Sequence, residues 1–429
     1  MTWRAKVPPG PRGRFGRRWA SLAGVVTLGA AALVAVPAAG PAYAAAVPCN
    51  DAALVTAVAG VAATGGSLSL APGCTYTLTA ADNADNGLAV ITGSVSITGN
   101  GATIQRSSTA PMFRIFEVGS GGTLSLTSLT IRGGNVNGQG AGALVNGGGT
   151  LNTTRTRFIA NTTVGNGDGG GVSVLTSGTS TSNGDTYTDN VGFHGGAINS
   201  DGTSTITNAT ITGNRGVEGG GVNNDSTASN ITISGSAFTR NVVNGTSGDG
   251  AAADFDGGTV KISSSTFSLN TTTRTTTAGF AGAIYNAANL TMTGSLVTRN
   301  TLTTAGNGAE GGGIYNDGVL TLVNTTVNAN SVNGTAHNDA GGIYNDGTLT
   351  LQRSTVNANT VANGFAGGVY NDGGTLTATG STISGNTSSE APGGLSNDGG
   401  TVTLTGSVIG GNNPTNCVGS PSPVPGCVG

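Results

Sequence analysis

The sequence predicts an all-β fold, a right-handed, single-stranded parallel β-helix of about 12–13 coils with a short capping helix at its N-terminal end. Three observations support this prediction: the composition, the alternation of apolar and polar residues, and a repeat of 24–30 residues. Glycine contributes 77 of the 429 residues, whereas charged residues make up 9% and aromatic residues 4%. Chains with exposed amphipathic helices carry about 25% charged residues, so this composition excludes an ordinary helical or α/β enzyme.

Residues 1–44 have the features of a secretory signal peptide. Six basic residues precede an apolar run from Leu22 to Ala39, and Ala42-Tyr43-Ala44 offers a cleavage site. We therefore expect export to the extracellular space or the cell surface, with no insertion into a membrane after cleavage. The pair Arg17-Arg18 leaves the general secretory and the twin-arginine routes both open.

Removal of this leader changes the net charge of the chain. The six basic residues leave, so 11 of the 17 basic residues remain against 20 acidic residues, a net charge of −9. A protein this acidic repels phosphate groups. We therefore expect neither nucleic acid nor an anionic membrane among its partners, and we expect a monomer.

Four cysteines lie near the two ends of the chain, Cys49 and Cys74 at one end and Cys417 and Cys427 at the other. Four cysteines allow three pairings. The local pairs are favoured, because each would close a short loop at one end of the fold in an oxidising compartment. Free buried thiols remain the alternative.

The segments that flank the repeats predict two caps. In residues 45–66, Asn50 or Asp51 precedes a helix that ends at Gly65-Gly66. Residues 67–412 then form the β-helix, starting with a strand at 67–70, and residues 413–429 form a C-terminal cap closed by a disulfide. The apolar face of the helix consists of Leu54, Val55, Val58, Val61 and Ala62.

The repeat predicts the internal structure of each coil. A unit holds three short strands, for example Gly342–Asn345, Thr348–Gln352 and Thr355–Asn359, and strands rise about 3.3 Å per residue, so one unit completes one circuit. Alternation places residues such as Ile314 and Ile343 inside. Each unit closes on an asparagine, and we expect these side chains to stack as an internal amide ladder. They are Asn161, Asn190, Asn214, Asn241, Asn270, Asn300, Asn330, Asn359, Asn386 and Asn412.

Turns of the type Asn-Asp-Gly place an aspartate at one corner of many coils. Like charges one coil apart repel each other, so these side chains are either solvated or partly compensated by a cation. Calcium is therefore the one candidate ion, at an edge formed by Asp317, Asp346, Asp372 and Asp398, and no other cofactor is predicted. Asp201, Asp225 and Asp256 continue the same edge.

Two short motifs stand out in the repeats, Gly195-Gly196-Ala197-Ile198 and the pattern Phe-x-x-Asn at Phe158–Asn161, Phe238–Asn241 and Phe267–Asn270. They resemble the Gly-Gly-Ala-Ile and Phe-x-x-Asn motifs of the polymorphic outer membrane protein repeats. The resemblance spans roughly residues 140–412 and implies a β-helix of a surface-exposed bacterial protein with an adhesin-like role. Because the sequence ends at Gly429, we expect release or non-covalent surface retention instead of a C-terminal membrane barrel.

One column of outward positions is a candidate binding face. Tyr285, Tyr315, Tyr344 and Tyr370 occupy the same position in four consecutive coils, which predicts an exposed aromatic ladder with a spacing of about 4.8 Å. Asp254 precedes them in the same column. A glycan chain can stack on such rings, whereas the alternative is that the rings only stack on one another. The loops that enter this column would wall a groove with Asp249, Arg274, Glu310 and Asp339.

Motifs for catalysis are missing from the sequence. His194 and His337 are about five coils apart, and Phe193-His194-Gly195-Gly196 is only a superficial echo of the Gly-His-Gly motif of polygalacturonase-like hydrolases. If the chain were a hydrolase, Asp254 with Asp256 or Glu310 would supply acid and base. A lyase would use Arg274 or Lys261 as its base.

The sequence therefore favours an exported, non-catalytic β-helix protein that contacts a polysaccharide or another cell-surface ligand. The alternative is a polysaccharide lyase or glycoside hydrolase of the pectin-lyase-like class. A third interpretation is a structural spacer of the cell envelope, which would bind no ligand.

Overall fold

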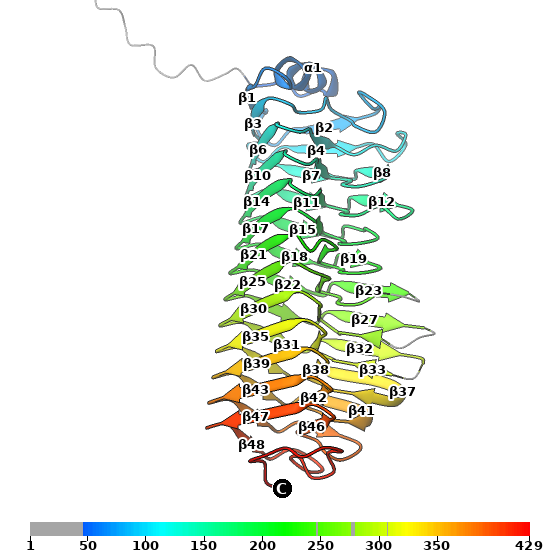
Figure 1. The fold of residues 1–429 in the computed structure, drawn as a ribbon. Helices are drawn as coiled ribbons and strands as arrows, with labels where there is room; N and C mark the ends of the chain where they lie inside the picture. The colour runs from blue at the N-terminus through cyan, green and yellow to red at the C-terminus, as the bar shows by residue number, and fades with distance from the viewer. Residues whose placement is uncertain (1–45, 246–247, 276–278, 307) are drawn as a thin grey trace, which may run out of the picture. The chain divides into compact units, whose positions relative to one another are not determined.

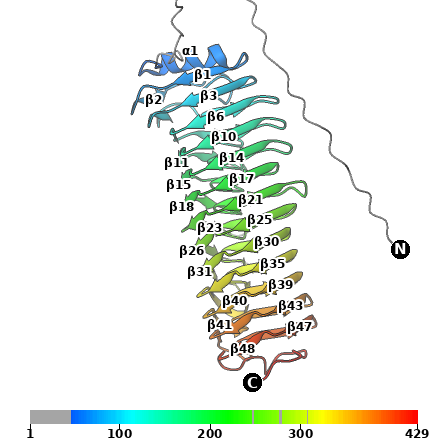
Figure 2. The ribbon, with the colours of Figure 1, turned by 90° about the vertical axis from the view of Figure 1, so that its left-hand side faces the viewer.

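The computed structural model describes residues 46–429 except 246–247, 276–278 and 307. The predicted leader lies outside the described residues. The described chain forms a parallel β-helix, as predicted, in which each circuit contributes one strand to each of several parallel sheets (Figures 1 and 2). Among the described helices, none is long and apolar enough to cross a membrane.

Two sheets of 13 strands run along the whole β-helix. Sheet 1 contains β1 (Gly66–Ser69), β3 (Ser94–Thr98), β6 (Thr123–Thr127), β10 (Thr150–Thr154), β14 (Thr179–Asn183), β17 (Thr203–Thr207), β21 (Asn230–Ser234), β25 (Thr259–Ser263), β30 (Asn289–Thr293), β35 (Val319–Val323), β39 (Thr348–Gln352), β43 (Thr375–Thr379) and β47 (Thr401–Thr405). Sheet 2 contains β2 (Thr75–Leu78), β4 (Thr103–Arg106), β7 (Thr130–Arg132), β11 (Arg157–Ile159), β15 (Thr186–Thr188), β18 (Thr210–Thr212), β22 (Ala237–Thr239), β26 (Thr266–Ser268), β31 (Leu296–Thr298), β36 (Thr326–Asn328), β40 (Thr355–Asn357), β44 (Thr382–Ser384) and β48 (Val408–Gly410).

Sheet 3, with 11 strands, completes the three-sided coil. It contains β5 (Phe116–Val118), β9 (Ala143–Val145), β13 (Val172–Val174), β16 (Ile198–Ser200), β20 (Val222–Asn224), β24 (Ala253–Phe255), β29 (Ile284–Asn286), β34 (Ile314–Asn316), β38 (Ile343–Asn345), β42 (Val369–Asp372) and β46 (Leu395–Asp398).

A fourth strand, which the sequence did not predict, lies between sheets 2 and 3 in many coils. These strands pair from coil to coil because the loops there lengthen into extended arms (Figure 1). They are β8 (Asn135–Asn137), β12 (Thr162–Val164), β19 (Arg215–Gly216), β23 (Val242–Gly245), β27 (Thr271–Arg274), β28 (Gly279–Phe280), β32 (Thr301–Thr304), β33 (Ala309–Glu310), β37 (Ser331–Asp339), β41 (Thr360–Phe365) and β45 (Thr387–Ser388).

The helix α1 (Asp51–Val61) covers the first coil. The side chain of Asn50 accepts a hydrogen bond from the Ala53 amide at 2.8 Å, so Asn50 is the N-cap. Leu54 and Val58 are fully buried against the end of the core. The predicted helix is confirmed, and it shields apolar residues that an open end would expose.

Stacked glycines explain the Gly-Gly motifs of the sequence. A Cβ atom on Gly313 would lie 2.7 Å from the carbonyl oxygen of Gly342 in the next coil, and one on Gly342 would lie 2.5 Å from that of Gly368. Backbone of adjacent coils therefore approaches so closely at this point that only glycine fits.

The predicted asparagine ladder is confirmed, and its hydrogen bonds are complete. The Oδ1 atom of Asn330 accepts from both the backbone amide and the Nδ2 atom of Asn300, at 3.0 and 2.9 Å. The Nδ2 atom of Asn330 donates to Asn359 at 2.9 Å and to the carbonyl of Val297 at 3.0 Å. This pattern of side-chain contacts repeats from Asn161 to Asn412.

Two further internal ladders were not predicted. The asparagines that follow the four tyrosines and Ser396 form one ladder, in which Nδ2 donates to the next Oδ1 at 2.6–2.8 Å, along Asn286, Asn316, Asn345, Asn371 and Asn397. At the corner between sheets 1 and 2, a backbone amide donates to a hydroxyl of the next coil, as from Ser236 to Ser265 at 3.1 Å. Each corner of the coil thus has its own column of buried polar groups.

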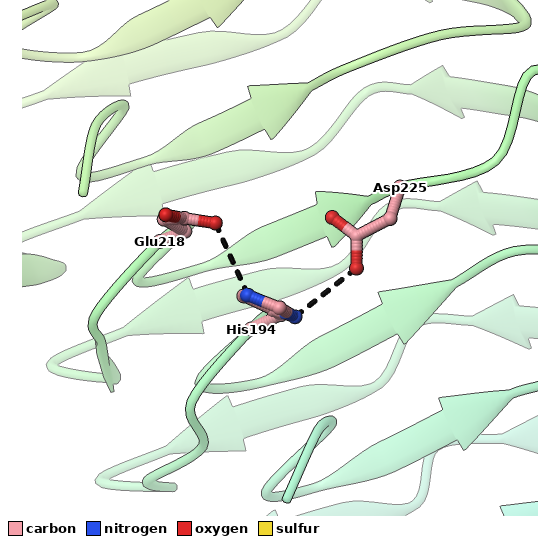
Figure 3. A group of neighbouring side chains, drawn as sticks. All are labelled: His194, Glu218 and Asp225. Atoms are coloured by element: carbon pink, nitrogen blue, oxygen red, sulfur yellow. Dashed lines mark ion pairs between the residues drawn. The ribbon is translucent and has the colours of Figure 1, made fainter. Parts of the chain in front are cut away.

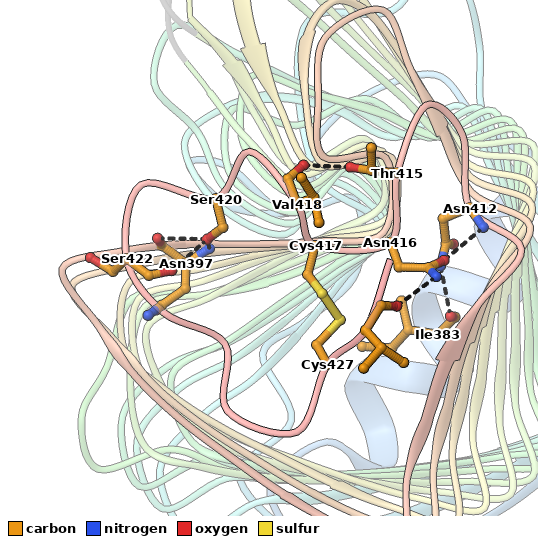
Figure 4. Close-up of a disulfide and its surroundings, with 11 residues drawn as sticks. Ile383, Asn397, Asn412, Thr415, Asn416, Cys417, Val418, Ser420, Ser422 and Cys427 are labelled. Atoms are coloured by element: carbon orange, nitrogen blue, oxygen red, sulfur yellow. Dashed lines mark hydrogen bonds between the residues drawn. A yellow bond between two sulfur atoms is a disulfide. The ribbon is translucent and has the colours of Figure 1, made fainter.

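The C-terminal segment closes the last coil. Asn416 ends the first ladder, because its Oδ1 atom accepts from both the backbone and the side chain of Asn412 at 3.1 Å (Figure 4). The carbonyl of Pro423 accepts from Asn397 at 3.2 Å and ends the second ladder. Disulfides join Cys49 to Cys74 and Cys417 to Cys427, the two local pairs that the sequence favoured.

Two neighbouring asparagines test the energetic role of the ladder. Asn330→Ala leaves the buried donors of Asn300 without their acceptor, so we expect the free energy of unfolding to fall by roughly 2–4 kcal/mol. Asn328→Ala is the matched control, because the Oδ1 atom of Asn328 has no hydrogen-bond partner. Urea unfolding followed by circular dichroism measures both, and equal losses would contradict the structural role of the ladder.

Candidate functional site

The outward face of sheet 3 gathers most of the polar and aromatic side chains singled out by the sequence. They form three columns that run from coil to coil, because the strands pair in strict parallel register. The central column is Ser173, Asn199, Asn223, Asp254, Tyr285, Tyr315, Tyr344, Tyr370 and Ser396. The corner column is Asp201, Asp225, Asp256, Asp317, Asp346, Asp372 and Asp398. The loop column is Asp168, His194, Glu218, Asp249, Phe280, Glu310, Asp339 and Phe365.

The four tyrosines stack face to face. Their ring centroids are 5.3, 5.0 and 5.4 Å apart along the column, and neighbouring planes differ by 3–7°. The predicted exposure is wrong for the two inner tyrosines: Tyr315 is 8% and Tyr344 5% exposed, because Phe280, Ala281 and Ala340 pack against them. Tyr285 and Tyr370, at the ends of the column, are half-buried. The inner ring faces cover one another, so the geometry fits the alternative in which the rings stack on one another. The column presents ring edges and hydroxyls outward.

Carboxylates border the tyrosines on both sides. The hydroxyl of Tyr344 donates to Asp372 at 2.6 Å, and that of Tyr370 to Asp398 at 3.4 Å. In the loop column, burial and the nearby charge of Asp339 raise the pKa of Glu310 to about 8. Burial and the charge of Asp372 likewise raise the pKa of Asp339 to about 6. The part of the face around the four tyrosines therefore holds carboxyl groups that take up protons close to neutral pH.

His194 lies among three carboxylates on the N-terminal half of the face, and Figure 3 shows two of them, Glu218 and Asp225. Its Nδ1 atom is 3.0 Å from Asp168 Oδ1 and 3.1 Å from Asp225 Oδ2, and its Nε2 atom is 3.1 Å from Glu218 Oε2. Burial alone would lower the pKa of His194, but the carboxylates of Asp168, Asp225 and Glu218 raise it to about 12. His194, Glu218 and Asp225 offer three ligand atoms within 4.8 Å of one another, a set that can hold a metal ion.

The proposed acid and base residues lie in different settings. Asp254 is only 3% exposed, and burial together with the charge of Asp256 raises its pKa well above the usual range. Burial and the charge of Asp225 raise the pKa of Asp256 to about 6. Asp254 and Asp256 belong to adjacent columns of one coil, whereas Glu310 belongs to a later coil. The structure therefore brings Asp254 beside Asp256, and it does not bring Glu310 to them.

The two candidate lyase bases do not form a catalytic group on this face. The Nη2 atom of Arg274 is 2.7 Å from Asp249 Oδ1, its Nε atom donates to the carbonyl of Gly248 at 3.0 Å, and its guanidinium lies 5.6 Å from the ring centroid of Phe280. Lys261 lies in β25 of sheet 1, away from the sheet 3 face. Arg274 is thus an element of the loop wall rather than an accessible base.

The cluster around His194 was missed by the sequence analysis, which treated His194 as isolated. A signal for it exists: each member of the loop column directly precedes the small-residue motif of its coil, as in His194-Gly195-Gly196 and Glu218-Gly219-Gly220. Aligning the repeats on their glycines instead of their closing asparagines places His194 next to Glu218.

Comparison with known proteins concerns the fold alone. No protein family and no curated protein matches the sequence. Among solved structures, the tailspike protein of E. coli bacteriophage HK620 in complex with pentasaccharide shares 13% identity, with a TM-score of 0.41, over 83% of this chain and 74% of that chain. A double mutant of the same tailspike protein shares 14% identity with the same TM-score and coverage. The β-solenoid fold that the resemblance to polymorphic outer membrane protein repeats implied is present. Membership of that family stays a prediction.

The raised pKa of Glu310 predicts a pH-dependent stability. Between the unfolded pKa near 4.3 and the folded pKa of about 8, the folded state binds more protons, so stability falls as the pH rises through this window. We expect Glu310→Gln to be about 1–3 kcal/mol more stable than the parent at pH 8.5 and no more stable at pH 4. Thermal unfolding at both pH values measures this, with Asp317→Asn, an exposed corner carboxylate, as the control. Equal effects at both pH values would contradict the assignment.

Proposed function

We propose that this is an exported, non-catalytic β-helix protein that binds an extended polysaccharide along the outward face of sheet 3. The observation that supports the proposal is the alignment of polar groups into three parallel columns that repeat once per coil, about every 4.8 Å. Carboxylates and amides bind sugar hydroxyls by hydrogen bonds, and an extended glycan repeats on a comparable length. A regular column can therefore contact successive sugars with equivalent groups.

The charge of the face narrows the class of glycan. Thirteen carboxylates belong to the three columns, against the guanidinium of Arg274 and the imidazole of His194. An anionic polysaccharide would be repelled by this surface, whereas neutral sugars and amino sugars would find acceptors for their hydroxyl and ammonium groups. We therefore propose a neutral or amino-sugar polymer as the ligand, met outside the cell after export through the predicted leader.

A glycoside hydrolase is the second candidate, and one observation favours it. Glu310 and Asp339 occupy paired positions in adjacent coils, and the pKa of Glu310 is raised to about 8 whereas that of Asp339 is raised to about 6. Two carboxyl groups with separated pKa values are the arrangement by which hydrolases obtain one acid and one base. The missing polygalacturonase motifs make binding without cleavage the leading proposal.

Retention on immobilised glycans tests the binding proposal. We expect the purified protein to be retained on neutral or amino-sugar polymers, and Asp372→Asn combined with Tyr344→Phe to weaken that retention about tenfold, because the bordering carboxylate and hydroxyl are removed. Asp189→Asn, an exposed carboxylate at the sheet 2 edge, is the matched control. Retention that is equal in the parent and both variants would place the ligand elsewhere, and no retention on any polymer would favour a spacer.

Release of new reducing ends from the same polymers separates the two candidates. We expect no release above that of a blank incubation, because the chain lacks the motifs of polygalacturonase-like hydrolases. Release by the parent that is lost in Glu310→Gln and kept in Asp189→Asn would instead establish the hydrolase and replace the leading proposal.

A further inference from the structure

Three carboxylates lie against the ring of His194, which can donate at most two N–H hydrogen bonds. Oxygen atoms of Asp168 and Asp225 lie 3.0 and 3.1 Å from the same Nδ1 atom, yet Nδ1 has no aligned hydrogen-bond partner. Glu218 takes the other side of the ring, with its oxygen 3.1 Å from Nε2. Asp168 also accepts from the His194 backbone amide at 3.4 Å and from Gln139 at 3.0 Å. With one proton on each ring nitrogen, the Oδ2 atom of Asp225 is therefore the carboxylate oxygen left for a cation to engage.

Two buried oxygen atoms in the central column lack partners beside this cluster. Asn223 is fully buried and Asp254 is 3% exposed, and the Oδ1 atom of each has no hydrogen-bond partner. The residues lie side by side in β20 and β24, and the Nδ2 atom of Asn223 donates to Asp225 at 2.8 Å, so its amide borders the cluster directly. An unpaired buried acceptor costs roughly 1–3 kcal/mol. A donor or a cation within reach of these oxygen atoms would remove that cost.

Charge points to a cation rather than to a neutral donor. His194 contacts three carboxylates, and Asp201, Asp254 and Asp256 occupy the adjoining positions of the corner and central columns. Arg274 is engaged by Asp249, so its charge is largely matched by that carboxylate. A divalent cation would offset part of the remaining negative charge at short range.

We propose that His194, Glu218 and Asp225 bind a divalent first-row transition-metal ion, such as Zn²⁺ or Mn²⁺, next to the buried residues Asn223 and Asp254. In this arrangement Nε2 of His194 binds the metal beside Glu218, and Nδ1–H points to Asp168, the carboxylate–imidazole–metal relay common in protein metal sites. The carboxylate of Asp225, whose Oδ2 atom is 3.1 Å from Nδ1 in this structure, turns toward Nε2 to complete the set. Metal–ligand bonds of about 2.0–2.2 Å place neighbouring ligand atoms about 3 Å apart, as Nε2 and Glu218 Oε2 are.

The donor set distinguishes this metal from calcium. Calcium takes oxygen ligands only, whereas one imidazole nitrogen with carboxylate and amide oxygens suits zinc or manganese. The proposal does not depend on glycan binding, because it follows from contacts within the chain. The exposed corner edge at Asp317, Asp346 and Asp398 offers carboxylates without a nitrogen ligand, so the two sites would differ in metal preference.

Metal titration of the chelator-treated protein tests the proposal. We expect one Zn²⁺ or Mn²⁺ per chain by calorimetry, a change in the electron paramagnetic resonance spectrum of Mn²⁺ on binding, and a rise in melting temperature. His194→Gln should weaken Zn²⁺ binding at least tenfold, whereas His337→Gln, which changes the other histidine of residues 45–429, should leave it unchanged. Ca²⁺ at the same concentration should not displace Zn²⁺.

A second variant keeps the test decisive if His194→Gln fails to fold. The side chain of Asp225 is 35% exposed, so Asp225→Asn should fold, and we expect it too to lose at least tenfold in Zn²⁺ affinity. The proposal is overturned if the parent binds neither metal, if either variant binds as the parent does, or if His337→Gln loses binding equally. In those cases His194 is an imidazolium held by its carboxylates.

Discussion

The fold depends on satisfying backbone and side-chain polar groups at the corners of a stacked coil. A strand can bond to the strands above and below it, but a corner turns polar groups toward a dry interior, where each unpaired group is costly. The ladder from Asn161 to Asn412 removes this cost by having each amide serve the coils before and after it. The last asparagine of the ladder still needs an acceptor, which Asn416 supplies. A single coil has no neighbours to satisfy its polar groups, so it has no stability of its own.

The regular stacking of the buried residues also determines how the outward side chains are arranged. Because each coil is fixed in register by its buried residues, the same outward position recurs in the same place, and like side chains come to lie about one coil apart. For tyrosines this proximity is favourable, since their rings stack. For carboxylates it is not: burial, together with the repulsion between neighbouring carboxylates, raises the pKa values of Asp256, Asp339 and Glu310. The face of sheet 3 therefore holds charge that a ligand with donors or a cation can relieve.

The repeating core could be predicted from the sequence because the patterns that specify it are either local or recur once per coil. The closing asparagines, the capping helix and the local disulfides were predicted correctly for this reason. The second ladder was missed because Asn316 next to Asp317 reads equally well as a turn residue. The exposure of Tyr344 was wrong because Ala340 and Phe280, which cover the column, come from loops of irregular length. The contacts of His194 were missed because they join three coils whose loop lengths differ, and no single repeat contains them.

The contact of Arg274 with Asp249 and Phe280 divides the face into two parts that differ in chemistry. Toward the N-terminal side lie His194 and the acidic cluster, and toward the C-terminal side lie the tyrosines and the pair of Glu310 with Asp339. The guanidinium neutralises Asp249 and stacks near Phe280, so it ends the acidic cluster where the aromatic column begins. Since each coil contacts mainly its neighbours, a change in one part is transmitted weakly to the other. A metal ion held at His194 and a glycan held along the tyrosines would then be independent ligands of one continuous surface.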